Sequence, residues 1–147
     1  MIAEVLCMAF MSLGLANSDV ACDNMQLIVD ESENNNIDPS LIVGLIYVES
    51  RFNPKAKSWA NACGLMQILP RYSKKYGGKD RNLTCDELKD PKTSITTGTK
   101  ILKFWKEKYA RGKIKTALCG YNAGFRCKGP NRNQKSFKVS NQNKKGI

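Results

Sequence analysis

Apolar side chains recur every three or four positions along much of this chain, a spacing typical of helices that bury one face. The clearest such stretch follows Asp38-Pro39 and has apolar residues at Leu41, Ile42, Leu45 and Ile46. Asp38 can accept hydrogen bonds from the free backbone N–H groups of a first helical turn. Pro39 suits the first helical position because it has no N–H to leave unpaired. The pattern predicts a helix that begins at Pro39 and continues through Glu49.

Three further stretches have the same spacing. We predict helices at about residues 24–33, 93–109 and 113–121. The longest of these has one apolar face, formed by Ile95, Gly98, Leu102, Trp105 and Tyr109. Gly98 on that face would let another helix approach closely. No stretch alternates with the period of two that an extensive sheet requires, and 147 residues suit one domain, so the expected fold is a mainly α single domain.

The apolar run at residues 5–16 is followed by Asn17, Ser18 and Asp19. Twelve residues are too few to cross a bilayer, which takes about 20, so we expect no stable membrane insertion. The run resembles the core of a secretory signal, and Ala16 and Ser18 are small residues at the positions a signal peptidase reads. We therefore expect residues 1–18 to be a signal peptide, although no basic residue precedes the run. The alternative is a buried N-terminal helix of the mature fold.

Six cysteines also favour an exported protein with disulfides, because none forms a C-x-x-C pair and the chain has no His to complete a metal site. Removal of Cys7 with the signal would leave five cysteines, and if Cys7 stays, 15 pairings are open. We favour one bond that joins the region of Cys63 or Cys85 to a neighbouring loop.

The net charge of +11 is unevenly distributed. Residues 1–50 hold eight acidic and no basic residues, whereas residues 51–147 hold all 24 basic residues and five acidic ones. Such a charge indicates an anionic partner: nucleic acid, a membrane surface or a bacterial envelope polymer. Residues 126–147 hold seven basic and no acidic residues and are expected to form a basic tail beyond a folded domain at residues 19–125.

The absence of His excludes Ser-His and Cys-His nucleophile pairs, so acid–base chemistry falls to other groups. Glu49 continues the apolar face of its predicted helix, close to the C-terminal end. Burial and the negative end of the helix dipole both raise the pKa of a carboxyl there, as a general acid requires. A guanidinium of Arg51 that folded back would oppose this shift. The alternative is a Glu that reaches solvent at the helix end.

Four short motifs occur in one order along the chain: residues 49–54 (ESRFNP), 64–67 (GLMQ) with Pro70, Asp90-Pro91 ahead of Gly98, and 121–124 (YNAG). In this order and spacing the chain resembles the soluble lytic transglycosylase (SLT) domain, a goose-lysozyme-like family of bacterial cell-wall enzymes. The resemblance covers about residues 37–125. It implies a lysozyme-like domain with a substrate cleft and no cofactor or metal.

The resemblance assigns the reaction to the first and last motifs. It implies that Glu49 is the single catalytic acid and base and that Ser50 helps to orient the reacting sugar or its neighbours. It also implies that the Tyr121 hydroxyl supports Glu49 and that Asn122 shapes the site. The alternative for Tyr121 is a core aromatic residue.

The middle motif is expected to contact the substrate. The resemblance implies that Gln67 binds sugar in the cleft and that Met66 forms part of its apolar wall, although a plain core position is the simpler interpretation of Met66. The chain departs from the family at Ser94, where Asn is usual, and at Gly120, where Ala is usual.

The implied reaction is the cleavage of the MurNAc-β-1,4-GlcNAc bond of peptidoglycan to give 1,6-anhydromuramyl ends. A two-carboxylate glycosidase needs a second acid about 5–9.5 Å away, and the only other carboxylate in the four motifs is Asp90, at the expected start of a helix. The alternatives are a hydrolysing lysozyme of the same fold, with Asp86 or Asp90 as second carboxylate, a cationic wall-binding protein without catalysis, or an inactive assembly factor.

The expected partners are the glycan strands of peptidoglycan, and not nucleic acid. The expected role is local opening of the wall, for a secretion, conjugation or pilus apparatus or for a phage. The expected location is therefore the periplasm, the medium or a phage virion.

Overall fold

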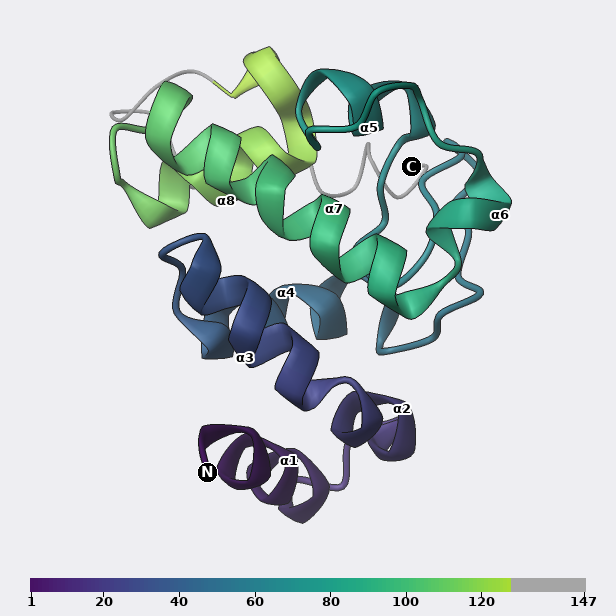
Figure 1. Cartoon of the computed structure of the whole chain (residues 1–147), viewed down its shortest axis with the longest axis vertical. Helices are drawn as coiled ribbons and strands as arrows, with labels where there is room; N and C mark the ends of the chain where they lie inside the picture. The colour runs from purple at the N-terminus through teal and green to yellow at the C-terminus, as the bar shows by residue number, and fades with distance from the viewer. Residues whose placement is uncertain (128–147) are drawn as a thin grey trace.

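The computed structural model describes residues 1–127, and over this range the chain is mainly helical, as predicted (Figure 1). The central helix α7 (Pro91–Phe104) crosses the molecule, and α3 (Met25–Asn34) packs against both α7 and α4 (Pro39–Ser50). The only β-type pairing among the described residues consists of isolated bridges at residues 57, 63 and 68. The basic tail lies outside the described residues from position 128 on.

Two Asp-Pro pairs fix the starts of the two principal helices. Asp38 accepts a hydrogen bond of 2.9 Å from the Ser40 backbone N–H, and Pro39 is the first residue of α4, as predicted. Asp90 caps α7 in the same way through the Thr93 N–H at 3.0 Å. The predicted helices at 24–33 and 113–121 correspond to α3 and to α8 (Ile114–Ala123).

The predicted helix at 93–109 is longer than expected at its start and changes type at its end. It begins at Pro91, and its last five residues form the π-helix η1 (Trp105–Tyr109), in which the Ala110 N–H bonds to the Trp105 carbonyl at 2.8 Å. The wider π turn accompanies an edge-to-face contact between the Trp105 and Tyr109 rings, whose centroids lie 5.3 Å apart.

Four short or terminal helices were not predicted from periodicity. They are α1 (Ile2–Ser12), α2 (Ser18–Asp23), α5 (Pro70–Lys75) and α6 (Cys85–Leu88). The first of them coincides with the expected signal segment. Its Phe10 is 4% exposed, and its ring makes edge-to-face contacts with Tyr47 and Phe52. A packed N-terminal helix is the alternative to a signal peptide that the sequence left open. Removal of residues 1–18 as a signal peptide stays a prediction.

Three disulfides join Cys7 to Cys22, Cys63 to Cys85 and Cys119 to Cys127. The second links the two regions that the sequence analysis singled out. No helix among residues 1–127 is both long and apolar enough to cross a membrane.

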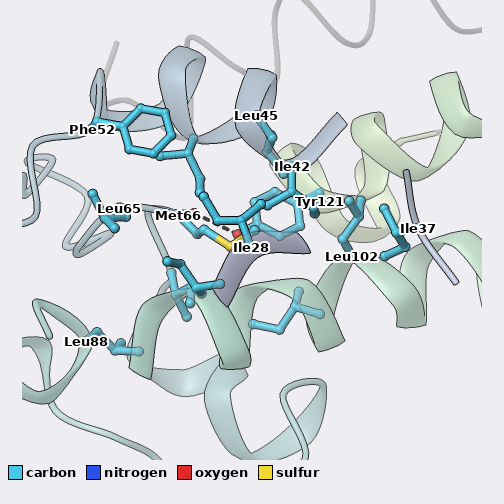
Figure 2. Packing of buried hydrophobic residues seen from close by; sticks show 14 of the residues in the cluster. Ile28, Ile37, Ile42, Leu45, Phe52, Leu65, Met66, Leu88, Leu102 and Tyr121 are labelled. Carbon is cyan, nitrogen blue, oxygen red and sulfur yellow. Dashed lines mark hydrogen bonds between the residues drawn. The ribbon is translucent and has the colours of Figure 1, made fainter. Parts of the chain in front are cut away.

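The core lies between α3, α4 and α7 and extends into the loop after α4 (Figure 2). Gly98 of α7 faces this loop, but its neighbour is the Met66 side chain and not another helix. A Cβ at position 98 would lie 2.4 Å from the Met66 sulfur. The loop can therefore sit directly on α7 only because residue 98 is Gly.

The hydrogen bonds of Glu87 in α6 should stabilise the folded chain to an extent that depends on pH. Its carboxylate accepts two hydrogen bonds from the Arg81 guanidinium, at 2.8 and 2.7 Å, and one from the Thr84 N–H, and these bonds lower the pKa of Glu87 to about 2. Because the folded pKa lies below the usual 4.5, the ionised carboxylate stabilises the folded state. This contribution to the free energy of unfolding is complete above pH 4.5 and is lost as the pH falls towards 2.

We expect urea unfolding of Glu87→Gln to depend less on pH across this window than unfolding of the natural chain. Asp86→Asn is the matched control, because Asp86 makes only a 3.7 Å ion pair with Lys89. Equal pH dependence in Glu87→Gln and the natural chain would refute this account.

Candidate active site

Glu49 lies on the buried face of α4, one residue before the helix ends. Its side chain is 6% exposed and shares that face with Ile42, Leu45 and Ile46. Arg51 stops the helix by adopting a left-handed conformation with φ of 52°. Its guanidinium lies over the Tyr47 ring, 5.5 Å from the centroid. Burial of Glu49 matches the expectation from the apolar pattern, and the alternative of a Glu that reaches solvent is wrong for this conformation.

The GLMQ loop is held against three helices by hydrogen bonds from their side chains. The Ser50 hydroxyl at the end of α4 donates to the Leu65 carbonyl at 2.7 Å. The Met66 N–H donates to the Ser94 hydroxyl of α7 at 3.0 Å. The Tyr121 hydroxyl of α8 donates to the Met66 carbonyl at 2.7 Å, a bond visible in Figure 2. The loop is therefore fixed relative to α4, α7 and α8 together.

These bonds change the roles expected for two residues. Ser50 has its hydroxyl committed to the protein backbone, so in this conformation it positions the loop. Met66 is fully buried, and its side chain therefore belongs to the core instead of an open cleft wall. The unusual Ser94 supplies the hydroxyl that anchors the loop to α7.

Gln67 is buried as well, at 4% exposed, and adopts a positive φ of 50°. Its side-chain amide N–H groups donate to the carbonyls of Ala56 and Gly64, both at 3.0 Å. Both amide protons are therefore used inside the protein. A contact between Gln67 and a sugar in this conformation would have to use the amide oxygen.

Tyr121 is electrostatically linked to Glu49. Burial, and after it the negative charge of Glu49, raise the pKa of the Tyr121 hydroxyl well above its ordinary value. The hydroxyl therefore stays protonated, and its proton is donated to Met66. Because the hydroxyl proton is already donated to Met66, Tyr121 could only accept in a hydrogen bond with Glu49 in this conformation, and Glu49 would have to be the donor.

A pocket of about 670 Å³ opens beside these residues. It is lined by residues from the start of α5, from η1 and from the end of α8 with η2 (Gly124–Arg126): Ala60, Leu69, Arg71, Tyr72, Tyr76, Trp105, Tyr121, Asn122, Ala123, Gly124, Phe125 and Arg126. Glu49 is not among them, but Tyr121, whose hydroxyl pKa is raised by burial and then by the charge of Glu49, does line the pocket. Aromatic rings and amide groups along one wall are what a saccharide site requires.

Asn122 brings an unused hydrogen-bond acceptor to this pocket. Its side-chain N–H donates to the Leu118 carbonyl at 3.2 Å, and its side chain is 5% exposed. Its buried oxygen has no hydrogen-bond partner among the described residues. Because an unpaired buried carbonyl is costly, a ligand hydroxyl or N–H that reached it would be bound favourably.

The carboxylates considered as second acids are used elsewhere. Asp90 accepts hydrogen bonds from the N–H and the hydroxyl of Thr93, which lower its pKa. Asp86 is largely exposed and pairs with Lys89. None of the described residues that line the pocket is Asp or Glu.

Sequence reasoning missed much of the pocket wall. Tyr72 and Arg71 follow directly after Pro70, and Phe125 and Arg126 follow directly after the YNAG motif. Their position next to the two motifs is the only feature of the sequence that could have marked them as residues of the site. Trp105 was expected only as part of an apolar helix face, yet it packs on Gly120, where a Cβ would lie 2.6 Å from its ring. The unusual Gly at position 120 therefore makes room for Trp105.

Comparison with known proteins places this chain among bacterial transglycosylase domains. Membrane-bound lytic murein transglycosylase C of Glaesserella parasuis is 36% identical over 113 residues, which are 68% of this chain and 30% of that protein. Membrane-bound lytic murein transglycosylase E of Buchnera aphidicola is 41% identical over 86 residues, 56% of this chain and 39% of that protein. This chain thus spans about a third of the length of these relatives.

Two solved structures share the fold. The 70 kDa soluble lytic transglycosylase of Escherichia coli superposes with a TM-score of 0.64 at 24% identity, over 81% of this chain and 19% of that chain. An inactive mutant of the lytic transglycosylase Slt of Pseudomonas aeruginosa has a TM-score of 0.62 at 22% identity, over 80% and 22% of the two chains. The model of the transglycosylase SLT domain matches residues 26–144. This chain therefore belongs to the transglycosylase SLT domain family.

Proposed function

We propose that this chain is a peptidoglycan lytic transglycosylase in which Glu49 is the only catalytic carboxylate. The observation that carries the proposal is a buried Glu49 whose charge acts on Tyr121, a residue of a pocket whose described lining holds no second acid. Membership of the family and relatives named lytic murein transglycosylases support the same activity.

In the proposed reaction, protonated Glu49 gives its proton to the oxygen of the MurNAc-β-1,4-GlcNAc bond. The bond between that oxygen and C1 of the muramyl sugar breaks, and GlcNAc leaves with a 4-hydroxyl. The substrate's 2-acetamido group stabilises the positive charge at C1. The Glu49 carboxylate then takes the proton of the muramyl 6-hydroxyl, whose oxygen bonds to C1 and gives the 1,6-anhydro end.

The supporting residues act through position. Ser50, Ser94 and Tyr121 fix the GLMQ loop, and Gln67 braces it from within, so that the groups around Glu49 are ordered before substrate binds. Asn122 offers its unpaired oxygen to a sugar hydroxyl or to an acetamido N–H. We further propose that the chain is exported and opens the wall locally, in company with secretion, conjugation or pilus machinery or within a phage particle.

The test is incubation of the purified full chain with purified peptidoglycan, followed by chromatography of the soluble fraction. We expect release of glycan fragments that still carry their stem peptides. A protein that binds the wall and releases no glycan fragment would contradict the proposal and would favour the cationic binding protein.

The Cys119–Cys127 disulfide should matter for this activity, because it closes the segment that carries Phe125 and Arg126 onto α8. Replacing both cysteines by Ala should lower the free energy of unfolding by about 2.5 kcal/mol, the value for a loop of this size, and raise KM for peptidoglycan fragments. Urea unfolding and initial rates measure the two effects.

The control for this variant is the double Ala variant of Cys7 and Cys22, whose disulfide lies at α1 and α2. It should lose stability with KM unchanged, since neither residue lines the pocket. An equal rise of KM in both variants would show that the effect comes from general loosening of the fold.

A further inference from the structure

The pocket beside Tyr121 carries positive charge that the proposed reaction does not use. Arg71 lies at the start of α5 and Arg126 at the end of η2, so the two come from segments 55 positions apart and line one pocket. No described lining residue is acidic. The transfer of a proton by Glu49 requires neither arginine.

Each guanidinium is held in place without being neutralised. The Arg71 guanidinium stacks over the Tyr72 ring, 4.9 Å from the centroid, and lies 3.5 Å from the Tyr72 hydroxyl. The Arg126 Nε–H points to the Ala123 carbonyl at 3.5 Å, and the next residue, Cys127, is tied to α8 by its disulfide. Both side chains are exposed, so their outer N–H groups face solvent.

Neither pocket arginine forms an ion pair with a carboxylate of residues 1–127. The ion pairs within this range involve the chain terminus, Arg81 and Lys89. Residues 128–147 contain no Asp or Glu, so no side chain from that segment can neutralise the pair either. Two positioned, uncompensated guanidinium groups beside aromatic rings suit an anionic group on a sugar polymer, because the planar guanidinium matches a carboxylate with two parallel hydrogen bonds.

We propose that Arg71 and Arg126 form a subsite that binds a carboxylate of the glycan substrate and so selects for acidic strands. This inference rests on the proposed function for the nature of the polymer. Peptidoglycan can present the carboxylate from two sources: the peptide stem, or the lactyl group of a muramyl sugar whose stem has been removed.

The test measures binding and not cleavage, in the otherwise full chain with Glu49→Gln to prevent turnover. Soluble glycan fragments are titrated by calorimetry in three forms: with stems, without stems, and with every carboxylate converted to a neutral amide. Arg71→Gln and Arg126→Gln are compared with Arg111→Gln, which removes the same charge from an exposed turn that does not line the pocket.

We expect each pocket variant to raise Kd for a carboxylate-bearing fragment by about tenfold, or about 1.4 kcal/mol, with Kd for the amidated fragment and for the Arg111 control unchanged. A loss confined to fragments with stems assigns the stem carboxylate, and a loss confined to fragments without stems assigns the lactyl carboxylate. High salt should weaken the same interactions.

Three results would overturn the subsite. They are unchanged Kd in both pocket variants, an equal loss on amidated fragments, and an equal loss in Arg111→Gln. Absence of binding by the protein that retains both arginines would overturn it as well. Because cleavage plays no part in the readout, failure of the transglycosylase proposal would be seen separately, in the release of fragments from peptidoglycan by the natural chain.

Discussion

Glu49→Gln should reduce release of soluble fragments from peptidoglycan by at least about 100-fold, the lower range for loss of a general acid. Gln keeps the volume of the side chain and its ability to form hydrogen bonds, but it has no proton to give to the glycosidic oxygen. The buried position of Glu49 makes replacement by another group or by water difficult. Initial rates on purified peptidoglycan measure the effect.

The matched control for that experiment is Glu107→Gln, the same chemical change on an exposed residue of η1. It should retain the full rate. Circular dichroism and urea unfolding establish that Glu49→Gln is folded. Retention of fragment release in folded Glu49→Gln would contradict the single-acid mechanism and would show that another group gives the proton to the glycosidic oxygen.

Gly64→Ala should be the most destabilising of the small substitutions near the site. Gly64 has φ of +81°, and a Cβ there would lie 2.0 Å from the Leu88 backbone carbonyl oxygen. The left-handed conformation costs a non-Gly residue about 1–2 kcal/mol, and overpacking adds about 1–3 kcal/mol. We therefore expect a loss of about 3 kcal/mol or more in urea unfolding, together with loss of activity, because Gly64 begins the loop that Ser50 and Tyr121 hold.

Gly44→Ala is the control for this substitution. Position 44 lies within α4, and a Cβ there meets nothing within 4 Å. Ala should stabilise this helix by about 0.5–1 kcal/mol through its higher helix propensity. A Gly64→Ala protein as stable as the natural chain would show that the loop and α6 can separate at little cost.

The helices that place the site were predictable because their starts carry a local signal. Asp38-Pro39 and Asp90-Pro91 each combine a capping carboxylate with a residue suited to the first turn, and the apolar spacing after them is regular. The same spacing put Glu49 on the apolar face, and of the two positions that it left open, buried or reaching solvent, the structure has the buried one. The π turn at Trp105 was not predictable, because an apolar position every three or four residues does not distinguish α from π hydrogen bonding.

The details of the site depend on contacts between distant segments, which spacing cannot supply. Ser50 and Tyr121 both donate to backbone carbonyls of the GLMQ loop, contacts that the motifs alone did not predict. Arg71 and Arg126 lie on short elements without periodicity, and only the fold brings them to one pocket. The helix α1 coincides with a run whose composition equally suits a secretory signal.

The chemical identity of the muramyl ends tests the central claim most directly. In the proposed single-acid reaction, the muramyl 6-hydroxyl competes with water for C1, and its tether gives it a large effective concentration. Mass spectrometry of the digest should therefore find muropeptides lighter by one water than those from a hydrolysing lysozyme, with ends that borohydride does not reduce. Hydrated, reducible muramyl ends as the main product would contradict the account and would require a second carboxylate, with Asp86 and Asp90 the first to replace.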